Sequence, residues 1–318
     1  MFDVIGIGTA VKDFLFAVEK IPTGDSGARA LYISSQFGGK VATAMAAVAR
    51  QGLKGAFYGK TGGDAKGRLI KEDFERHGLD TSHLECVEGK ESPFCICIAE
   101  TSTQTRKFIG KMADTPRLEV EDLDFEFLKN TRSMHFEGGS PVVVAAATFA
   151  KENGILTCID ADGYRPEIEE HEDLFDLFIG SEFYAAKRLP GAEPIEVCRE
   201  IAKKGCKVAI ITLGAKGGVG IANGEEFSYP AFSGMKIIDT TGAGDVFHGA
   251  YLSAYLMGYD PKEAARYASA VSYIKCTRLG GRAGIPTREQ TERFLKDGVL
   301  INEEELDARA KHYEDLVV

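Results

Sequence analysis

No apolar run in this 318-residue sequence approaches the roughly 18–20 residues that a membrane-spanning helix needs. The start, MFDVIGIG, reads as a strand and lacks the basic residues and cleavage site of a signal peptide. Basic residues are a minority, 38 against 48 acidic ones, for a net charge of −10. Such a surface repels phosphate backbones and anionic lipid. We therefore expect a cytoplasmic protein that binds neither nucleic acid nor membranes.

Patterns for disulfide frameworks and zinc sites are also missing. The seven cysteines are an odd number, include no CxxC pair, and lie mostly in apolar runs such as FCICIA at 94–99. The six histidines are scattered, without an HExxH pair. We therefore expect buried free thiols in a reducing compartment and no zinc site.

What the chain does contain is an alternation of strand and helix signals. Strands are predicted at 3–8, 55–60, 133–139, 155–161, 176–181 and 207–214, followed by a hairpin at 217–232. Helices are predicted at 40–52, 65–78, 142–154, 194–205, 242–258, 260–276, 287–295 and 302–318. Repeated strand–helix units predict a mostly parallel sheet with helices on both faces.

Two segments interrupt this alternation, at about residues 13–37 and 92–112. Each reads as two strands around a turn. The two segments could pair into a small separate sheet at one edge of the α/β domain, where it would cover a site. We predict a lid there; an edge sheet that only supports a homodimer is the alternative, and both roles are compatible.

The stretch DTTGAGDVFHGA (239–250) carries the chemistry. It places Gly242, Ala243 and Gly244 ahead of a lone carboxylate, Asp245, where a helix is predicted to begin. The first backbone N–H groups of a helix have no intrahelical partner, and together with the helix dipole they bind anions. A carboxylate beside them can accept the proton of an attacking hydroxyl. The pattern favours phosphoryl transfer to an alcohol; an ordinary, tightly packed helix start is the alternative.

Two other phosphate-binding motifs fail. A Walker loop needs GxxxxGK[ST], but the nearest candidate has Ser34 at the first glycine position and Val41 after Lys40. A dinucleotide fingerprint is suggested by GIGTAV (6–11), which has Val11 at the third glycine position. An NAD-linked oxidoreductase is therefore only a weak competitor.

DTTGAGDVFHGA resembles the C-terminal signature of the ribokinase-like (PfkB) carbohydrate kinase family, whose core is DTxGAGD. The segment 37–67, which holds a Gly-Gly pair, a small-residue helix, a strand and a GxDxxG turn, is similar to that family's N-terminal signature. The resemblance implies a ribokinase-like three-layer α/β/α sandwich with a mostly parallel central sheet and a small β-sheet lid. It also implies a kinase domain at 1–298 and leaves a helical tail at 299–318.

The family resemblance implies ATP-dependent phosphorylation of a sugar hydroxyl, with Mg²⁺. The family's general base corresponds to Asp245, and its anion hole to Gly242, Ala243 and Gly244. Members of the family also respond to monovalent cations such as K⁺, for which the loop 239–241 is the place to look.

Further positions match the family's binding residues. On the substrate side these are Asp13, Gly39, Lys40, Glu137 and Arg165, the last in DADGYRP (160–166). Carboxylates suit sugars because each can accept two hydroxyl hydrogen bonds. On the nucleotide side the segment TLGAKGG (212–218) offers Thr212, Gly214 and Gly217.

Three positions depart from the family pattern. Thr43 stands where many members have a sugar-binding Asn, and SEFY (181–184) replaces NxxE, with Ser181 for Asn and Tyr184 for Glu. Glu182 is the candidate to take over at the phosphates and the metal. We predict a fructokinase- or ribokinase-like enzyme for a hexose, a ketose or an acidic sugar. A non-catalytic sugar or nucleotide sensor on the same fold, and a nucleoside kinase, are the alternatives.

Overall fold

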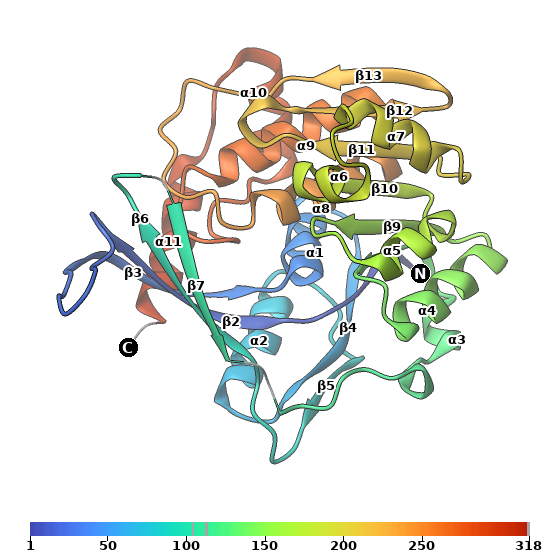
Figure 1. Cartoon of the computed structure of the whole chain (residues 1–318). Helices are drawn as coiled ribbons and strands as arrows, with labels where there is room; N and C mark the ends of the chain where they lie inside the picture. Colours follow the sequence, from blue (N-terminus) through green and yellow to red (C-terminus); the bar gives the residue numbers. More distant parts are fainter. Residues whose placement is uncertain (104, 112–113, 317–318) are drawn as a thin grey trace.

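The computed structural model describes residues 1–103, 105–111 and 114–316, and its strands there form two separate sheets (Figure 1). The large sheet has the order β13-β12-β11-β10-β9-β8-β1-β4-β5. Its strands are β1 (Phe2–Ile7), β4 (Gly55–Gly62), β5 (Leu84–Val87), β8 (Thr131–Glu137), β9 (Leu156–Ala161), β10 (Leu177–Ser181), β11 (Val208–Thr212), β12 (Gly218–Ala222) and β13 (Glu225–Tyr229). In the sheet order, the strands from β11 to β5 pair in parallel, and β12 alone runs antiparallel to its two neighbours, β11 and β13.

Helices cover both faces of this sheet, because its parallel strands bury side chains on both sides. One core layer joins Val4 and Ile210 to α1 (Lys40–Arg50), α2 (Ala65–Arg76), α8 (Ala243–Leu256) and α9 (Pro261–Lys275). The other joins Ile5 and Ile211 to α4 (Pro141–Glu152), α5 (Pro166–Glu170), α6 (Glu182–Arg188) and α7 (Pro194–Ala202). Two core layers around one sheet confirm the expected three-layer α/β/α sandwich.

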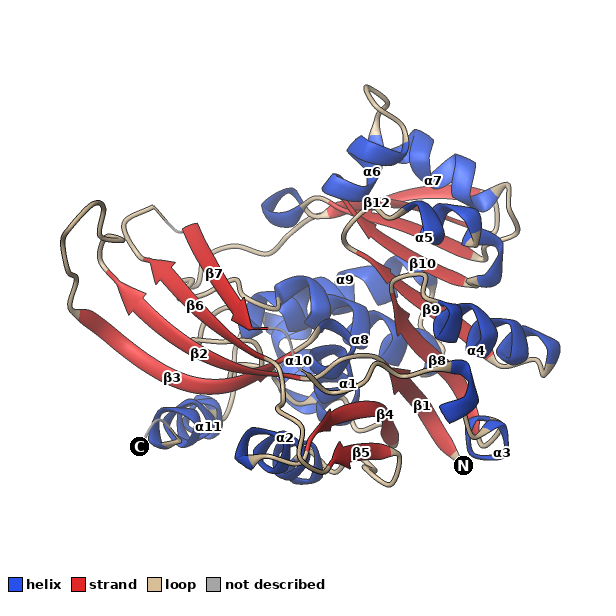
Figure 2. Ribbon diagram, turned by 60° about the horizontal axis from the view of Figure 1, so that its bottom comes forward, coloured by secondary structure: helices blue, strands red, loops and turns tan. Residues whose placement is uncertain are grey.

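The two segments that interrupt the alternation pair with each other, as expected. They form a four-stranded sheet, β3-β2-β6-β7, from β2 (Val11–Val18), β3 (Ala30–Gly38), β6 (Phe94–Glu100) and β7 (Thr105–Lys111). Figure 2 shows this small sheet to the left of the large one. Met112, the end of the predicted segment, lies outside the described residues. That the sheet acts as a lid stays a prediction.

The C-terminal segment folds back onto the small sheet. After α10 (Arg288–Asp297), α11 (Glu303–Asp315) packs beside β3, with Leu306 and Tyr313 buried (Figure 2). The Tyr313 hydroxyl donates to Asp73 Oδ1 at 2.8 Å, and Arg282 donates to Asp73 Oδ2 at 2.6 Å. The predicted helix at 302–318 is thus confirmed up to Asp315, and residues 317–318 lie outside the described part. The domain boundary at 298/299 stays a prediction.

Several elements were not predicted from the sequence. They are β5, α3 (Phe125–Leu128), α5 and α6, each only four to seven residues long. Elements of this length do not complete enough of a period to show in the sequence. The seven cysteines are free, as expected. Among the described helices, none is both long and apolar enough to cross a membrane.

A close contact brings helix α1 against helix α8. Val41 to Val48 of α1 are all buried, and most of them are small. Gly249 of α8 lies so near α1 that a Cβ there would come within 3.0 Å of the Ala44 carbonyl oxygen. Since both helices begin at the same edge of the sheet, this contact brings Lys40 and Asp245 close together.

We predict that Gly249→Ala lowers the thermal unfolding midpoint. In an unconstrained helix, alanine is about 0.8–1 kcal/mol more favourable than glycine. Here the added methyl must push α1 and α8 apart, at a cost of about 1–3 kcal/mol. Gly27→Ala is the control, because nothing lies within 4 Å of a Cβ at Gly27. Calorimetry that shows a raised midpoint for Gly249→Ala would contradict the close approach.

Candidate active site

The predicted site residues gather at the carboxyl-terminal edge of the parallel strands, where ligands bind in sheets of this kind. Gly39 and Lys40 lie at the start of α1, Glu137 ends β8, and Asp245 lies in the first turn of α8. A buried carboxylate that the sequence analysis did not single out, Asp160 near the end of β9, joins them. Residues distant in the sequence thus form one charged cluster.

Lys40 lies at the centre of this cluster. Its Nζ lies 3.7 Å from Asp160 Oδ1 and 3.3 Å from Asp162 Oδ2. Burial lowers the pKa of Lys40, but the nearby carboxylates of Asp160, Asp162, Asp245 and Glu137 outweigh that effect and raise it overall. Lys40 is therefore a permanent cation among four acidic groups.

The same surroundings raise the pKa of Asp245 above that of an exposed aspartate. Burial raises its pKa well above the usual value, and the negative charge of Asp160 raises it further, while Lys40 opposes the shift. A carboxylate with a raised pKa holds a proton more strongly and is a better general base near neutral pH. The Asp245 carboxylate is therefore suited to accept a proton.

Asp160 remains ionised behind Lys40. Burial raises its pKa, but His248, Lys40 and the Asp162 backbone N–H, which donates to Oδ1 at 2.9 Å, lower it overall. His248 Nε2 lies 3.7 Å from Asp160 Oδ2, one helical turn beyond Asp245 on α8. Burial lowers the pKa of His248. In the sequence, the only sign of Asp160 is that it stands with Asp162 in the stretch DADGYRP. Nothing in the sequence shows that Asp160 lies beside His248.

Of the other predicted substrate residues, Glu137 and Arg165 lie close to this cluster, whereas Asp13 lies in β2 of the small sheet. Glu137 Oε1 accepts the Thr9 N–H at 2.9 Å, and burial raises the pKa of Glu137. Arg165 is exposed at the start of α5, near enough to favour the ionised form of Glu137. Burial raises the pKa of Asp13 to about 6, against the charges of Arg282 and Lys12.

Two of the predicted substrate residues have structural roles: Gly39 is required by the backbone conformation, and Thr43 by the packing before α8. Gly39 has φ 94°, and a Cβ there would come within 3.0 Å of the Thr9 carbonyl oxygen, so only glycine fits. Thr43 is buried, and its Cγ2 lies 3.5 Å from the position of a Cβ on Gly242. Thr43 thus supports the loop before α8, and its predicted contact with a sugar stays a prediction.

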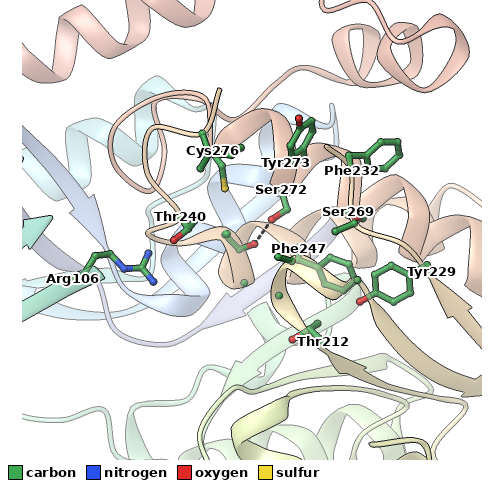
Figure 3. A pocket seen from close by; sticks show the side chains of 17 residues that line it. Arg106, Thr212, Tyr229, Phe232, Thr240, Phe247, Ser269, Ser272, Tyr273 and Cys276 are labelled. Atoms are coloured by element: carbon green, nitrogen blue, oxygen red, sulfur yellow. Dashed lines mark hydrogen bonds between the residues drawn. The ribbon is translucent and has the colours of Figure 1, made fainter. Parts of the chain in front are cut away.

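A cavity of about 440 Å³ opens on the other side of the α8 N-terminus (Figure 3). Thr212, Gly214 and Gly217, which were predicted for the nucleotide, line it together with Ala243 and Gly244. The other residues that line the cavity were not assigned to a nucleotide site from the sequence; they are Arg106, Ala215, Tyr229, Ala231, Phe232, Ile237, Thr240, Phe247, Ser269, Ser272, Tyr273 and Cys276. The spacing of 269, 272, 273 and 276 indicates one helix face, but only the fold shows what that face lines.

Glu182 is not among the residues that line this cavity; it is the exposed first residue of α6. Its neighbours have structural contacts. Ser181 Oγ caps α6 by accepting the N–H groups of Phe183 and Tyr184, and the Tyr184 hydroxyl donates to the buried Glu172. The two departures from NxxE are thus a helix cap and a core residue. Within the described part of the chain, no three acidic, His or Cys side chains are arranged to hold a metal.

The chain was compared with known proteins. Residues 1–288 match the profile of the pfkB family carbohydrate kinases. A ribokinase of Haemophilus influenzae is 29% identical over 82% of this chain and 87% of its own length. A 5-dehydro-2-deoxygluconokinase of Clostridium perfringens is 25% identical over 93% of both chains. The fold is shared with Arabidopsis thaliana ribokinase complexed with ribose and ATP, at a TM-score of 0.77, 22% identity and coverage of 93% and 99%.

These matches confirm the ribokinase-like fold that the resemblance implied. The profile spans both signature segments and includes Asp245 and the loop before it. The chain therefore belongs to the pfkB family of carbohydrate kinases and is a sugar kinase.

Proposed function

We propose that this protein transfers the terminal phosphoryl group of ATP to a sugar hydroxyl, with Asp245 as general base. One observation carries the proposal: the first turn of α8 separates the cavity from the charged cluster. Ala243 and Gly244 face the cavity, whereas Asp245 lies in the field of Lys40 and Asp160. A phosphoryl donor on one side and an alcohol on the other would meet at this turn.

The backbone of the turn would stabilise the charge of the migrating group. Ala243 N–H donates to the Thr240 carbonyl oxygen at 3.2 Å. The N–H groups of Gly242 and Gly244 have no hydrogen-bond partner among the described residues, and they lie at the positive end of a 14-residue helix. We propose that they form the anion hole, with Ala243 contributing its small side chain. Mg²⁺ would arrive with the ATP phosphates, as part of the substrate.

Lys40, Asp13, Glu137 and Thr43 would hold and orient the sugar. Carboxylates outnumber cations in the cluster, which favours uncharged hydroxyls as ligands there. Arg165, exposed near Glu137, is the cation available to a carboxylate at the rim of the site. We propose a hexose or ketose, or an acidic sugar whose carboxylate meets Arg165. The relatives named for ribose and for 5-dehydro-2-deoxygluconate support this range.

The small sheet would act as the lid of this site. From β7, Arg106 Nη1 contacts Thr241 Oγ1 at 3.3 Å and approaches Asp239 Oδ1 to 3.9 Å. In Figure 3 its guanidinium points toward the loop at Thr240. This contact joins the sheet to the loop beside the anion hole and supports closure over the reacting groups, which would exclude water.

We predict that Asp245→Asn lowers kcat by at least about 10²-fold, because the hydroxyl loses its proton acceptor. Nucleotide binding should be nearly unchanged. Release of ADP is measured over a panel of sugars, with Asp162→Asn, the exposed acid of the cluster, as the milder control. Near-normal turnover of Asp245→Asn would remove Asp245 from this role. Saturable sugar binding without turnover of any sugar by the wild type would favour a sensor.

We predict that kcat/KM falls on the acid side at a pH well above 3.8, the usual aspartate pKa, since Asp245 must be ionised to act as base. Asp160→Asn removes a neighbouring negative charge and should move this limb to lower pH. Lys40→Met removes the opposing cation and should move it to higher pH. Initial rates across pH test both shifts, and shifts in the same direction would contradict the assignment.

We also propose a homodimer through the small sheet. Its edge strands expose Leu31 (51%), Tyr32 (59%), Phe108 (59%) and Ile109 (60%), which would be covered in a dimer. We predict that Ile109→Glu shifts sedimentation velocity toward the monomer. Phe183→Glu, at an exposed apolar residue of α6, is the control and should leave the distribution unchanged. A wild type that sediments as a monomer at high concentration would exclude this interface.

A further inference from the structure

A buried lysine lies beneath the loop that precedes the anion hole. Lys275 is the last residue of α9, and its side chain is completely buried. Its Nζ donates to the backbone carbonyl oxygen of Asp239 at 3.1 Å and to that of Thr241. An ammonium group loses its hydration on burial, so these oxygens and the nearby Asp239 charge must replace the lost water.

The Asp239 carboxylate is engaged elsewhere. Oδ1 accepts the Thr241 N–H at 2.9 Å and the Thr241 hydroxyl at 2.7 Å, and Oδ2 accepts the Gly280 N–H at 2.8 Å. Burial raises the pKa of Asp239, but the Lys275 charge and these hydrogen bonds lower it overall. Asp239 is thus an ionised group with hydrogen bonds to both oxygens, and two cations lie near it: Lys275 beneath the loop and Arg106, whose Nη1 lies 3.9 Å from Oδ1.

The end of α9 holds the loop at a second point. The N–H groups of Ile238 and Asp239 donate to the Cys276 carbonyl oxygen at 2.8 and 3.2 Å. The C-terminus of a helix carries partial negative charge, which favours the Lys275 ammonium there. The loop that delivers Gly242 and Gly244 to the anion hole is therefore docked on the tip of α9.

This arrangement conflicts with a monovalent cation at residues 239–241, where the family resemblance placed one. K⁺ is bound by converging carbonyl oxygens. Here the oxygens of Asp239 and Thr241 already accept the Lys275 ammonium, and a second cation beside them would be repelled. The residues present do not fit a monovalent cation at this loop.

We infer that the Lys275 ammonium replaces a monovalent cation and makes the site independent of K⁺. Lys275 is a positioning residue: it holds the carbonyl groups of Asp239 and Thr241 inward, so that the N–H groups of Gly242 and Gly244 point to the phosphoryl group. This inference depends on one part of the proposed function, namely that the loop before α8 binds the phosphates of ATP.

The test compares K⁺ with a cation too large to enter the site. Wild type, Lys275→Ala, Lys275→Met and the exposed-lysine control Lys262→Ala are prepared in potassium, ammonium or tetramethylammonium chloride at one ionic strength. The binding of a non-hydrolysable ATP analogue is measured by thermal shift, and sugar-dependent ADP release by initial rates. Wild type and Lys262→Ala should behave alike in all three salts.

In tetramethylammonium, both Lys275 variants should bind the analogue at least about tenfold more weakly, because two hydrogen bonds from a charged donor are lost. K⁺ or NH₄⁺ should restore binding saturably in Lys275→Ala, which opens space, and less in Lys275→Met, which fills it. Stimulation of the wild type by K⁺ would overturn the inference. So would unchanged binding in Lys275→Met, or a folded Lys275→Ala that neither cation rescues. Binding of the ATP analogue is measured without turnover. A wild type that phosphorylates no sugar would therefore contradict the proposed function but not the inference about Lys275.

Discussion

The close approach of α1 and α8 is the contact on which the site depends. Their axes come together because small residues face each other, with Gly249 against the Ala44 backbone. Each helix starts at the same edge of the parallel sheet, so their first turns must meet. This places Lys40 and Asp245, which lie far apart in the sequence, in one electrostatic field. Neither helix could supply that field alone.

Burying several like charges together costs free energy, and the same burial and repulsion shift the pKa values of the carboxylates in the cluster. Four carboxylates surround Lys40, and their mutual repulsion with loss of water raises the proton affinity of Asp245. Asp160 escapes this effect because His248 and the Asp162 N–H stabilise its charged form. Asp160 and Asp245 belong to the same cluster but differ in proton affinity: Asp160 keeps its negative charge, whereas Asp245 is the better proton acceptor.

The departures from the family pattern have physical uses in this chain. Ser181 caps a helix that opens directly from β10, and Tyr184 satisfies the buried Glu172. Thr43 fills the space beneath Gly242 and Gly281. Lys275 adds an internal cation under the same loop. Thr43 and Lys275 thereby support the backbone that precedes α8.

Local sequence patterns were enough to predict the long elements and the start of α8 after the glycine-rich turn. Strand and helix periods predicted the sandwich, and DTTGAGD predicted free N–H groups beside a carboxylate, because both depend on residues near one another in the chain. Four of the residues that the structure adds could not be found this way: Asp160, His248, Lys275 and Cys276. Each is an ordinary residue in its own segment and gains its role from a partner far along the chain.

The sequence by itself therefore determined the fold class, the family and the glycine-rich turn at which α8 begins, since these follow from local backbone and hydrophobic patterns. Only the tertiary structure decided the proton affinity of Asp245, the ionised state of Asp160 and the occupation of the loop carbonyls by Lys275. Those properties depend on desolvation and on charge–charge distances, which exist only once the helices and strands have packed together.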